Sequence, residues 1–209
     1  MEYQTRAQSS PAIDAGLRQY MLSVYNYMAS GLALTGLVAY MLFQATAVMG
    51  PTGEIVGLTN LGVTLYTGPM MWVVALAPLG IVMYMSFGIQ GMSASRAQTM
   101  FWVFAFLMGL SLSTIFLTYT GASIARVFFI TASTFGAMSI YGYTTKRDLT
   151  NFGSFLFMGL IGIIIASIVN IFMQSPALYY GISILGVLIF VGLTAYDTQK
   201  IKNMYMAYD

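Results

Sequence analysis

Residues 153–173 read GSFLFMGLIGIIIASIVNIFM, a stretch without a single charged side chain. A helix needs about 20 apolar residues to cross the roughly 30 Å hydrocarbon core of a bilayer. The stretch has that length, and it holds no acidic or basic group that lipid would have to accommodate. It therefore predicts a transmembrane helix.

Five more uncharged apolar stretches follow the same pattern, at residues 28–48, 70–89, 97–119, 127–143 and 177–196. Hydrophobic residues make up 58% of the chain and charged residues only 7%, too little charge to solvate a globular surface of this size. The sequence predicts an all-α integral membrane protein, a polytopic bundle of six transmembrane helices in contact with the lipid bilayer. Residues 1–20 are polar and are expected to form an N-terminal tail, and residues 21–209 a single transmembrane domain.

The basic residues predict the orientation of these spans. Placing the N-terminus in the cytoplasm leaves only Arg126 outside and puts the other Lys and Arg residues on the cytoplasmic side, as the positive-inside rule favours. Those residues are Arg6, Arg18, Arg96, Lys146, Arg147, Lys200 and Lys202. With six spans the C-terminus at Asp209 is also cytoplasmic. Lys146-Arg147-Asp148 is interpreted as a solvated loop with no binding role.

Small residues recur within the spans at spacings that suit helix contacts. They are Gly31 and Thr35, Gly109 and Ser113, Gly159 and Gly162, and Gly181 and Gly186. Because lipid is as apolar as leucine, helices in a membrane associate where small side chains let their backbones approach. We expect helix–helix interfaces at these positions. The joints between spans are short, which favours antiparallel packing of consecutive helices.

Two residue types that carry much of protein chemistry are missing. The chain has no Cys and no His, which excludes disulfides, thiolate nucleophiles, zinc sites of the His/Cys type and His- or Cys-bound haem. We expect neither an enzyme nor a bound cofactor. A net charge of +2 spread over several loops gives no support for nucleic-acid binding.

Asp197 is the acidic residue placed at the inner end of a span, where an ionisable group is costly and marks a functional position. At about 100° per residue, a stripe roughly 80° wide joins it to mostly small or polar residues on one helix face. This stripe, expected to face the protein interior, contains Ser183, Gly186, Phe190, Thr194 and Asp197. Two interpretations stay open: Asp197 pairs with Lys200 one turn on, or it is a buried carboxylate that binds a cation. Asn26 and Tyr141 lie at the same depth and are possible neighbours.

Three segments give the chain a family resemblance. They are GYTTKRDL at residues 142–149, ASIVNIF at 166–172 and YDTQKI at 196–201. In this order, and with this hydropathy, they closely resemble the bacterial branch of the Bax inhibitor-1 family, also called the transmembrane Bax inhibitor motif family. The similarity covers about residues 18–209.

The resemblance implies a seven-helix fold with a central last helix, and a pH-sensitive calcium leak across the bacterial inner membrane. In the family, an aspartate pair on the last two helices shares a proton and acts as the sensor. Asp197 matches the first of the pair, while the sequence stops at Asp209, before the seventh helix. The resemblance therefore implies that Asp197 is the ion gate and proton sensor and that it contacts Ca²⁺, the transported ion.

An alternative function stays open beside the calcium leak. The chain is then a regulator or scaffold that transports nothing and binds a membrane quality-control protease or another membrane protein. The sequence leaves ion selectivity and oligomeric state open.

Overall fold

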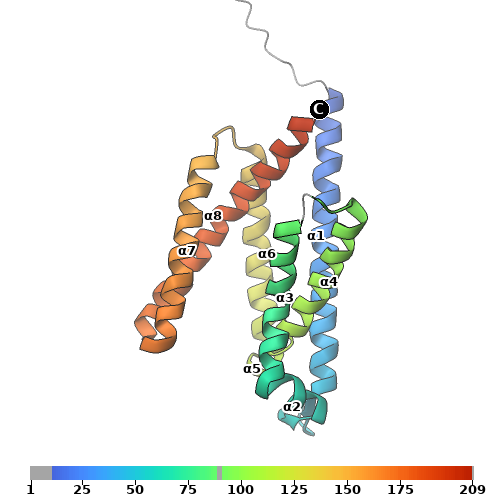
Figure 1. Ribbon diagram of the computed structural model, residues 1–209, viewed down its shortest axis with the longest axis vertical. Coiled ribbons are helices and arrows are strands. Elements are labelled where there is room, and N and C mark those ends of the chain that lie inside the picture. Colours follow the sequence, from blue (N-terminus) through green and yellow to red (C-terminus); the bar gives the residue numbers. More distant parts are fainter. Residues whose placement is uncertain (1–10, 89–90, 209) are drawn as a thin grey trace, which may run out of the picture. The chain divides into compact units, whose positions relative to one another are not determined.

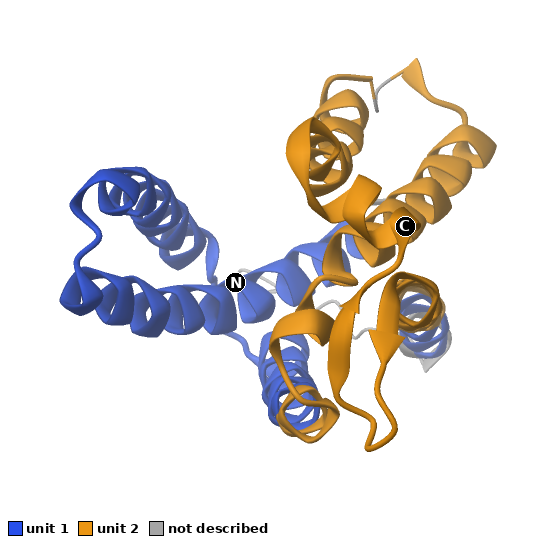
Figure 2. Ribbon diagram, turned by 90° about the horizontal axis from the view of Figure 1, so that it is seen from below, with its two compact units in different colours: residues 1–22, 127–209 blue, residues 23–126 orange. Residues whose placement is uncertain are grey.

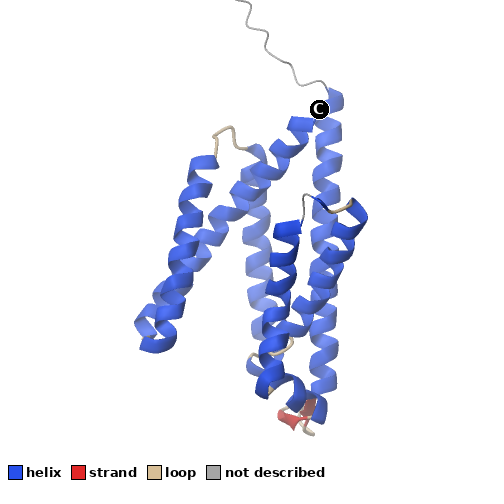
Figure 3. Ribbon diagram, viewed as in Figure 1, coloured by secondary structure: helices blue, strands red, loops and turns tan. Residues whose placement is uncertain are grey.

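A computed structural model describes residues 11–88 and 91–208, and it is almost entirely helical (Figures 1 and 3). Six of its helices are long and apolar enough to cross a membrane, which confirms the predicted all-α class and the six spans. The elements are α1 (Pro11–Thr46), β1 (Ala47–Met49), β2 (Ile55–Leu58), α2 (Asn60–Tyr66), α3 (Gly68–Gly88), α4 (Ala94–Leu112), α5 (Ile115–Thr118), α6 (Gly121–Thr144), α7 (Thr150–Met173) and α8 (Pro176–Tyr208).

The helices group into two compact units (Figure 2). The first contains residues 1–22 and 127–209, and the second contains residues 23–126. The single transmembrane domain expected over residues 21–209 accordingly stays a prediction.

The predicted N-terminal tail is partly helical. Helix α1 begins at Pro11, so residues 11–20 continue the first span, while residues 1–10 lie outside the described part of the chain. Leu17 and Met21, one turn apart, are 5% and 4% exposed. Tyr20 packs on Tyr205 of α8 with ring centroids 5.2 Å apart. The polar residues suggested a tail, but these apolar positions give the segment a packing face of its own.

In the second unit, helices α1 and α4 lie against each other through their small residues. The Thr35 hydroxyl donates a 2.8 Å hydrogen bond to the carbonyl of Ala105. A Cβ on Gly109 would lie 2.7 Å from the carbonyl oxygen of Thr35, so only glycine permits this approach. The interface expected from Thr35 and Gly109 is confirmed.

The loop after the first span contains a small hairpin that the sequence analysis did not predict. Strands β1 and β2 are antiparallel, with Ala47 opposite Leu58. Gly53 lies in the turn at φ +83°, a left-handed conformation that side chains disfavour. Strands this short carry too weak a periodicity to be recognised in sequence.

A chain of hydroxyl groups connects this loop to the long helices of the second unit. The Tyr66 hydroxyl lies 2.7 Å from that of Ser113 and 3.2 Å from that of Thr46. Thr46 and Ser113 have no accessible surface. Buried hydroxyls must be paired, so this network fixes α2 against the ends of α1 and α4.

In the first unit, α7 and α8 form an antiparallel helix hairpin, as the short joint at Ser175-Pro176 predicts (Figure 1). Gln174 ends α7 in the left-handed conformation, at φ 48°. The side-chain oxygen of Asn170 accepts a 3.0 Å hydrogen bond from the backbone N–H of Ser175. Asn170, part of the second resemblance segment, therefore stabilises this turn.

Candidate ion-gate site on helix α8

The C-terminal half of α8 is held between α6 and α7. A Cβ on Gly142 of α6 would clash with the carbonyl of Ala195, and one on Gly153 of α7 would clash with the ring of Tyr196. Ala195 is only 1% exposed. These glycines let two helices reach the backbone and ring of α8, and this fixes which face of α8 is buried.

Gln199 connects α8 to the loop between α6 and α7. Its Oε1 accepts a 2.9 Å hydrogen bond from the Leu149 N–H, and its Nε2 donates one of 2.8 Å to the Arg147 carbonyl. The side chain is 8% exposed. Both ends of the amide are thus satisfied by main-chain atoms, which defines the path of the loop.

Two lysines beside Gln199 are also engaged. The Lys202 ammonium donates a 2.8 Å hydrogen bond to the Tyr143 carbonyl and lies 5.4 Å from the centroid of the Tyr143 ring. The Lys200 ammonium lies 5.9 Å from the centroid of the Tyr196 ring. A cation near the last carbonyls of α6 interacts favourably with the dipole of that helix.

Asp197 is exposed in the described chain, so burial of its carboxylate within the membrane stays a prediction. The proposed stripe is not the packing face of α8 either, since Ser183 is exposed and Phe190 is 59% exposed. The buried face of α8 is set instead by Ala195 and Gln199. Lys200, one turn on, interacts with Asp197 electrostatically, although the two side chains form no salt bridge within residues 11–88 and 91–208.

The other predicted site residues bond within their own helix or are exposed on other helices. The Ser183 hydroxyl donates to the Tyr179 carbonyl and the Thr194 hydroxyl to the Phe190 carbonyl, both at 2.9 Å. Thr194 also lines a cavity of about 420 Å³ between α6 and α8. Tyr141 is 45% exposed on α6. Asn26 is exposed on α1 and belongs to the second unit.

Asp148 lies in the loop before α7, outside the spans. Its Oδ1 accepts hydrogen bonds from the Thr150 hydroxyl at 2.6 Å and from the Thr150 N–H at 2.9 Å. These bonds, the hydroxyl first, hold the pKa of the Asp148 carboxyl below its usual range. The carboxylate is therefore charged at neutral pH and stabilises the first turn of α7.

Among the described residues, Asp197 belongs to no cluster of metal-binding side chains. Nowhere in this part of the chain do three or more His, Cys, Asp or Glu residues come together as a metal site would require. Ca²⁺ takes six to eight oxygen ligands. Asp197 can attract such an ion, but a full coordination shell would need water and carbonyl oxygens as well.

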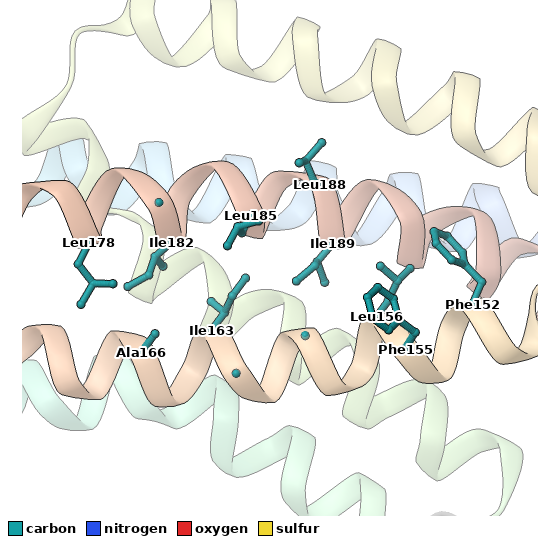
Figure 4. Close-up of a pocket in the computed structure, with 13 residues that line it drawn as sticks. Phe152, Phe155, Leu156, Ile163, Ala166, Leu178, Ile182, Leu185, Leu188 and Ile189 are labelled. Carbon is teal, nitrogen blue, oxygen red and sulfur yellow. The ribbon is translucent and has the colours of Figure 1, made fainter.

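The N-terminal half of α8 borders an apolar groove of about 600 Å³ shared with α7. Figure 4 shows Ile163, Ile182 and Ile189 lining it from the two helices. Three of the small residues predicted to make helix contacts lie here, namely Gly159, Gly162 and Gly181. A Cβ on Gly162 or Gly181 would meet nothing within 4 Å, so the predicted close contact is wrong at these positions.

Comparison with known proteins decides the family. A family model described as "Inhibitor of apoptosis-promoting Bax1" matches residues 17–209. The chain belongs to the Bax inhibitor-1 family. It is thus a Bax inhibitor-1 family membrane protein, and the resemblance of its three segments is confirmed.

Three bacterial relatives illustrate the match. An uncharacterized protein of Rickettsia prowazekii is 49% identical over 96% of this chain and 80% of its own length. One of Caulobacter vibrioides is 47% identical over 93% of this chain and 76% of its own. The inner membrane protein YbhL of Escherichia coli is 46% identical over 91% of this chain and 76% of its own length. No solved structure matches the chain, so the seven-helix arrangement stays an expectation for this Bax inhibitor-1 family member.

Sequence reasoning missed Gln199 and Lys202 as structural residues. The available signal was a polar amide beside Asp197 at the end of an apolar helix, level with the turn after residue 144. A long polar side chain at such a helix end can bond to unpaired main-chain N–H and C=O groups of a neighbouring turn. The hydrogen bonds of Gln199 and Lys202 are of this kind.

Proposed function

We propose that the protein passes Ca²⁺ slowly down its gradient across a bacterial inner membrane, with Asp197 attracting the cation and responding to protons. One observation carries the proposal: of six acidic residues, Asp197 is the one inside a described span. Such a group is costly at membrane depth, which makes it a functional candidate. Family membership and the name of the Escherichia coli relative support the location.

The proposed gate depends on the charge of Asp197. An ionised carboxylate supplies the oxygen ligands that Ca²⁺ prefers, and a protonated one loses this attraction. Near neutral pH, protonation requires shielding from water or a second carboxylate nearby. Because Asp197 is exposed in the described chain, the proposal requires that its face of α8 be covered in the membrane. Ser183 and Thr194 would line the path along α8, with Tyr141 of α6 as a further neighbour.

Calcium flux tests the role of Asp197. Purified protein is reconstituted into liposomes loaded with a calcium-sensitive dye, and flux is measured between about pH 6 and 8. We expect Asp197→Asn to abolish the pH dependence and to slow the leak. Asp148→Asn is the matched control, because it removes a carboxylate outside the spans. Identical pH profiles for wild type and Asp197→Asn would reject the role.

The proposed cytoplasmic N-terminus can be tested with introduced thiols, since the chain has no cysteine of its own. A membrane-impermeant maleimide should label Glu54→Cys in intact spheroplasts. Arg147→Cys should be labelled only after permeabilisation. The opposite pattern would invert the topology and move Asp197 to the outer side.

A second candidate is a membrane regulator without transport or enzymatic activity that binds a quality-control protease or another membrane protein. The open groove between α7 and α8 favours it, because large exposed apolar surfaces can receive partner helices. Absent flux, together with partner binding that survives Asp197→Asn, would favour this candidate over the leak.

A further inference from the structure

A polar pocket of about 420 Å³ lies where the loop between α6 and α7 meets the end of α8. Its charged and amide-bearing lining residues are Lys146, Arg147, Asp148, Gln199, Lys202 and Asn203, and we call it the basic pocket. It is separate from Asp197, which does not line it. From sequence alone, this loop is predicted to be solvated and to have no binding role.

The basic pocket has an excess of positive charge. Three cations and one carboxylate line it, which leaves a local charge of +2. The carboxylate, Asp148, already accepts two hydrogen bonds from Thr150. Lys202 gives one bond to the Tyr143 carbonyl, and an ammonium has three donors. The free donors of Lys202, Lys146 and Arg147 therefore favour an anion.

The floor of the basic pocket is fixed before any ligand arrives. The Gln199 amide holds the main chain at Arg147 and Leu149, and the Thr145 hydroxyl accepts a 3.3 Å hydrogen bond from the Arg147 N–H. A preformed site avoids the ordering cost that a mobile loop would add to binding. The two exposed cations at its rim then provide charge without also having to organise the loop.

The depth of the pocket indicates which anion reaches it. One span ends at Thr144 and the next begins at Thr150, so the loop lies at the membrane–water boundary. Lipid phosphates lie at this level, and basic pockets between transmembrane helices bind anionic headgroups. Arg matches the oxygens of a phosphate with paired donors, and Lys adds a point charge.

We propose that the basic pocket binds a phosphate anion, supplied by the headgroup of an anionic lipid such as phosphatidylglycerol. Lys146 and Arg147 contact the phosphate from the loop, and Lys202 contacts it from α8. Free inorganic phosphate shares this chemistry, so the experiment includes it as a separate arm. The proposal does not depend on calcium passage or on Asp197.

Native mass spectrometry of the detergent-solubilised protein measures the binding. Phosphatidylglycerol and phosphatidylcholine with identical acyl chains are added separately, and the bound fraction is counted for each. Each basic residue near a membrane surface contributes about 1 kcal/mol of attraction, so a double Lys146→Gln, Arg147→Gln variant should bind phosphatidylglycerol roughly tenfold or more weakly. Both side chains are exposed, and the bond from Gln199 reaches only the Arg147 carbonyl, so the variant should fold.

Lys200→Gln is the matched control, because it removes one cation from the same helix without touching the pocket lining. It should bind phosphatidylglycerol as the wild type does. In the second arm, inorganic phosphate competes at constant ionic strength. Phosphate that binds through Lys146 and Arg147, with no preference for phosphatidylglycerol over phosphatidylcholine, would support the site but assign it to free phosphate. The proposal is overturned if the double variant keeps full binding, if Lys200→Gln loses as much, or if neither ligand binds.

Discussion

The two halves of α8 use small residues in opposite ways. Toward its C-terminal end, Gly192 and Ala195 lie against α7 and α6, with a Cβ on Gly192 only 2.6 Å from Leu156. Toward its N-terminal end, a Cβ on Gly181 or Gly186 would have no neighbour within 4 Å. A small residue thus permits a close contact but does not create one. The hydrogen bonds from Gln199 and Lys202 anchor only the C-terminal half of α8.

Removing the Gln199 amide should cause the largest loss of stability, because it anchors the C-terminal half of α8. Gln199→Met keeps the length of the side chain but leaves the Leu149 N–H and the Arg147 carbonyl unpaired. A buried unpaired group costs about 1–3 kcal/mol, and the Arg147 carbonyl, which is only part-buried, costs less than the Leu149 N–H, so we expect a loss of about 2–4 kcal/mol in the free energy of unfolding. Unfolding in mixed detergent micelles, followed by circular dichroism, measures it. Asn203→Ala, exposed on the same helix, is the control and should change little.

The next largest effect is expected from Gly142→Ala, which forces a methyl group against the Ala195 carbonyl. Overpacking against backbone costs about 1–3 kcal/mol, since a carbonyl cannot rotate away as a side chain can. Gly136→Ala is the matched control on α6, because a Cβ there meets nothing within 4 Å. Equal unfolding midpoints for the two variants would show that the close approach of α6 and α8 is not required.

On α8 itself, one glycine substitution should stabilise and another should not. Gly186→Ala adds a better helix former in open space and should gain up to about 1 kcal/mol. Gly192→Ala must displace the tip of the flexible Leu156 side chain and should lose stability modestly. The same unfolding assay measures both. A loss of stability in Gly186→Ala would mean that the N-terminal half of α8 is covered in the folded protein.

The smallest expected effect concerns acid stability at the loop. The folded-state pKa of Asp148 is lowered from its ordinary value of 3.8 by its bonds to Thr150. Its contribution is therefore present above that ordinary value and is lost as pH falls through the lowered one. Wild type should lose slightly more stability than Asp148→Asn on acidification from about pH 5 to pH 2. Parallel unfolding curves for the two would contradict this account.

The sequence was sufficient to predict the spans but not their packing faces. Runs such as residues 153–173 specify membrane helices because length and lack of charge are local properties. The buried face of α8 is a property of its neighbours, since Gly142 and Gly153 decide where α6 and α7 approach. The stripe through Ser183 and Asp197 was therefore assigned to the interior on composition alone. The hairpin at Ala47 was too short to give a recognisable pattern.

The Gln199 amide binds main-chain atoms on both sides of Asp148, so the side chains of Lys146 and Arg147 are not needed to hold the loop in place. Lys146 and Arg147 can be replaced, or carry a fluorophore, while the junction between α6 and α7 keeps its course. The charge displayed at this edge of the membrane can consequently vary from one bacterium to another without rebuilding the helices beneath it.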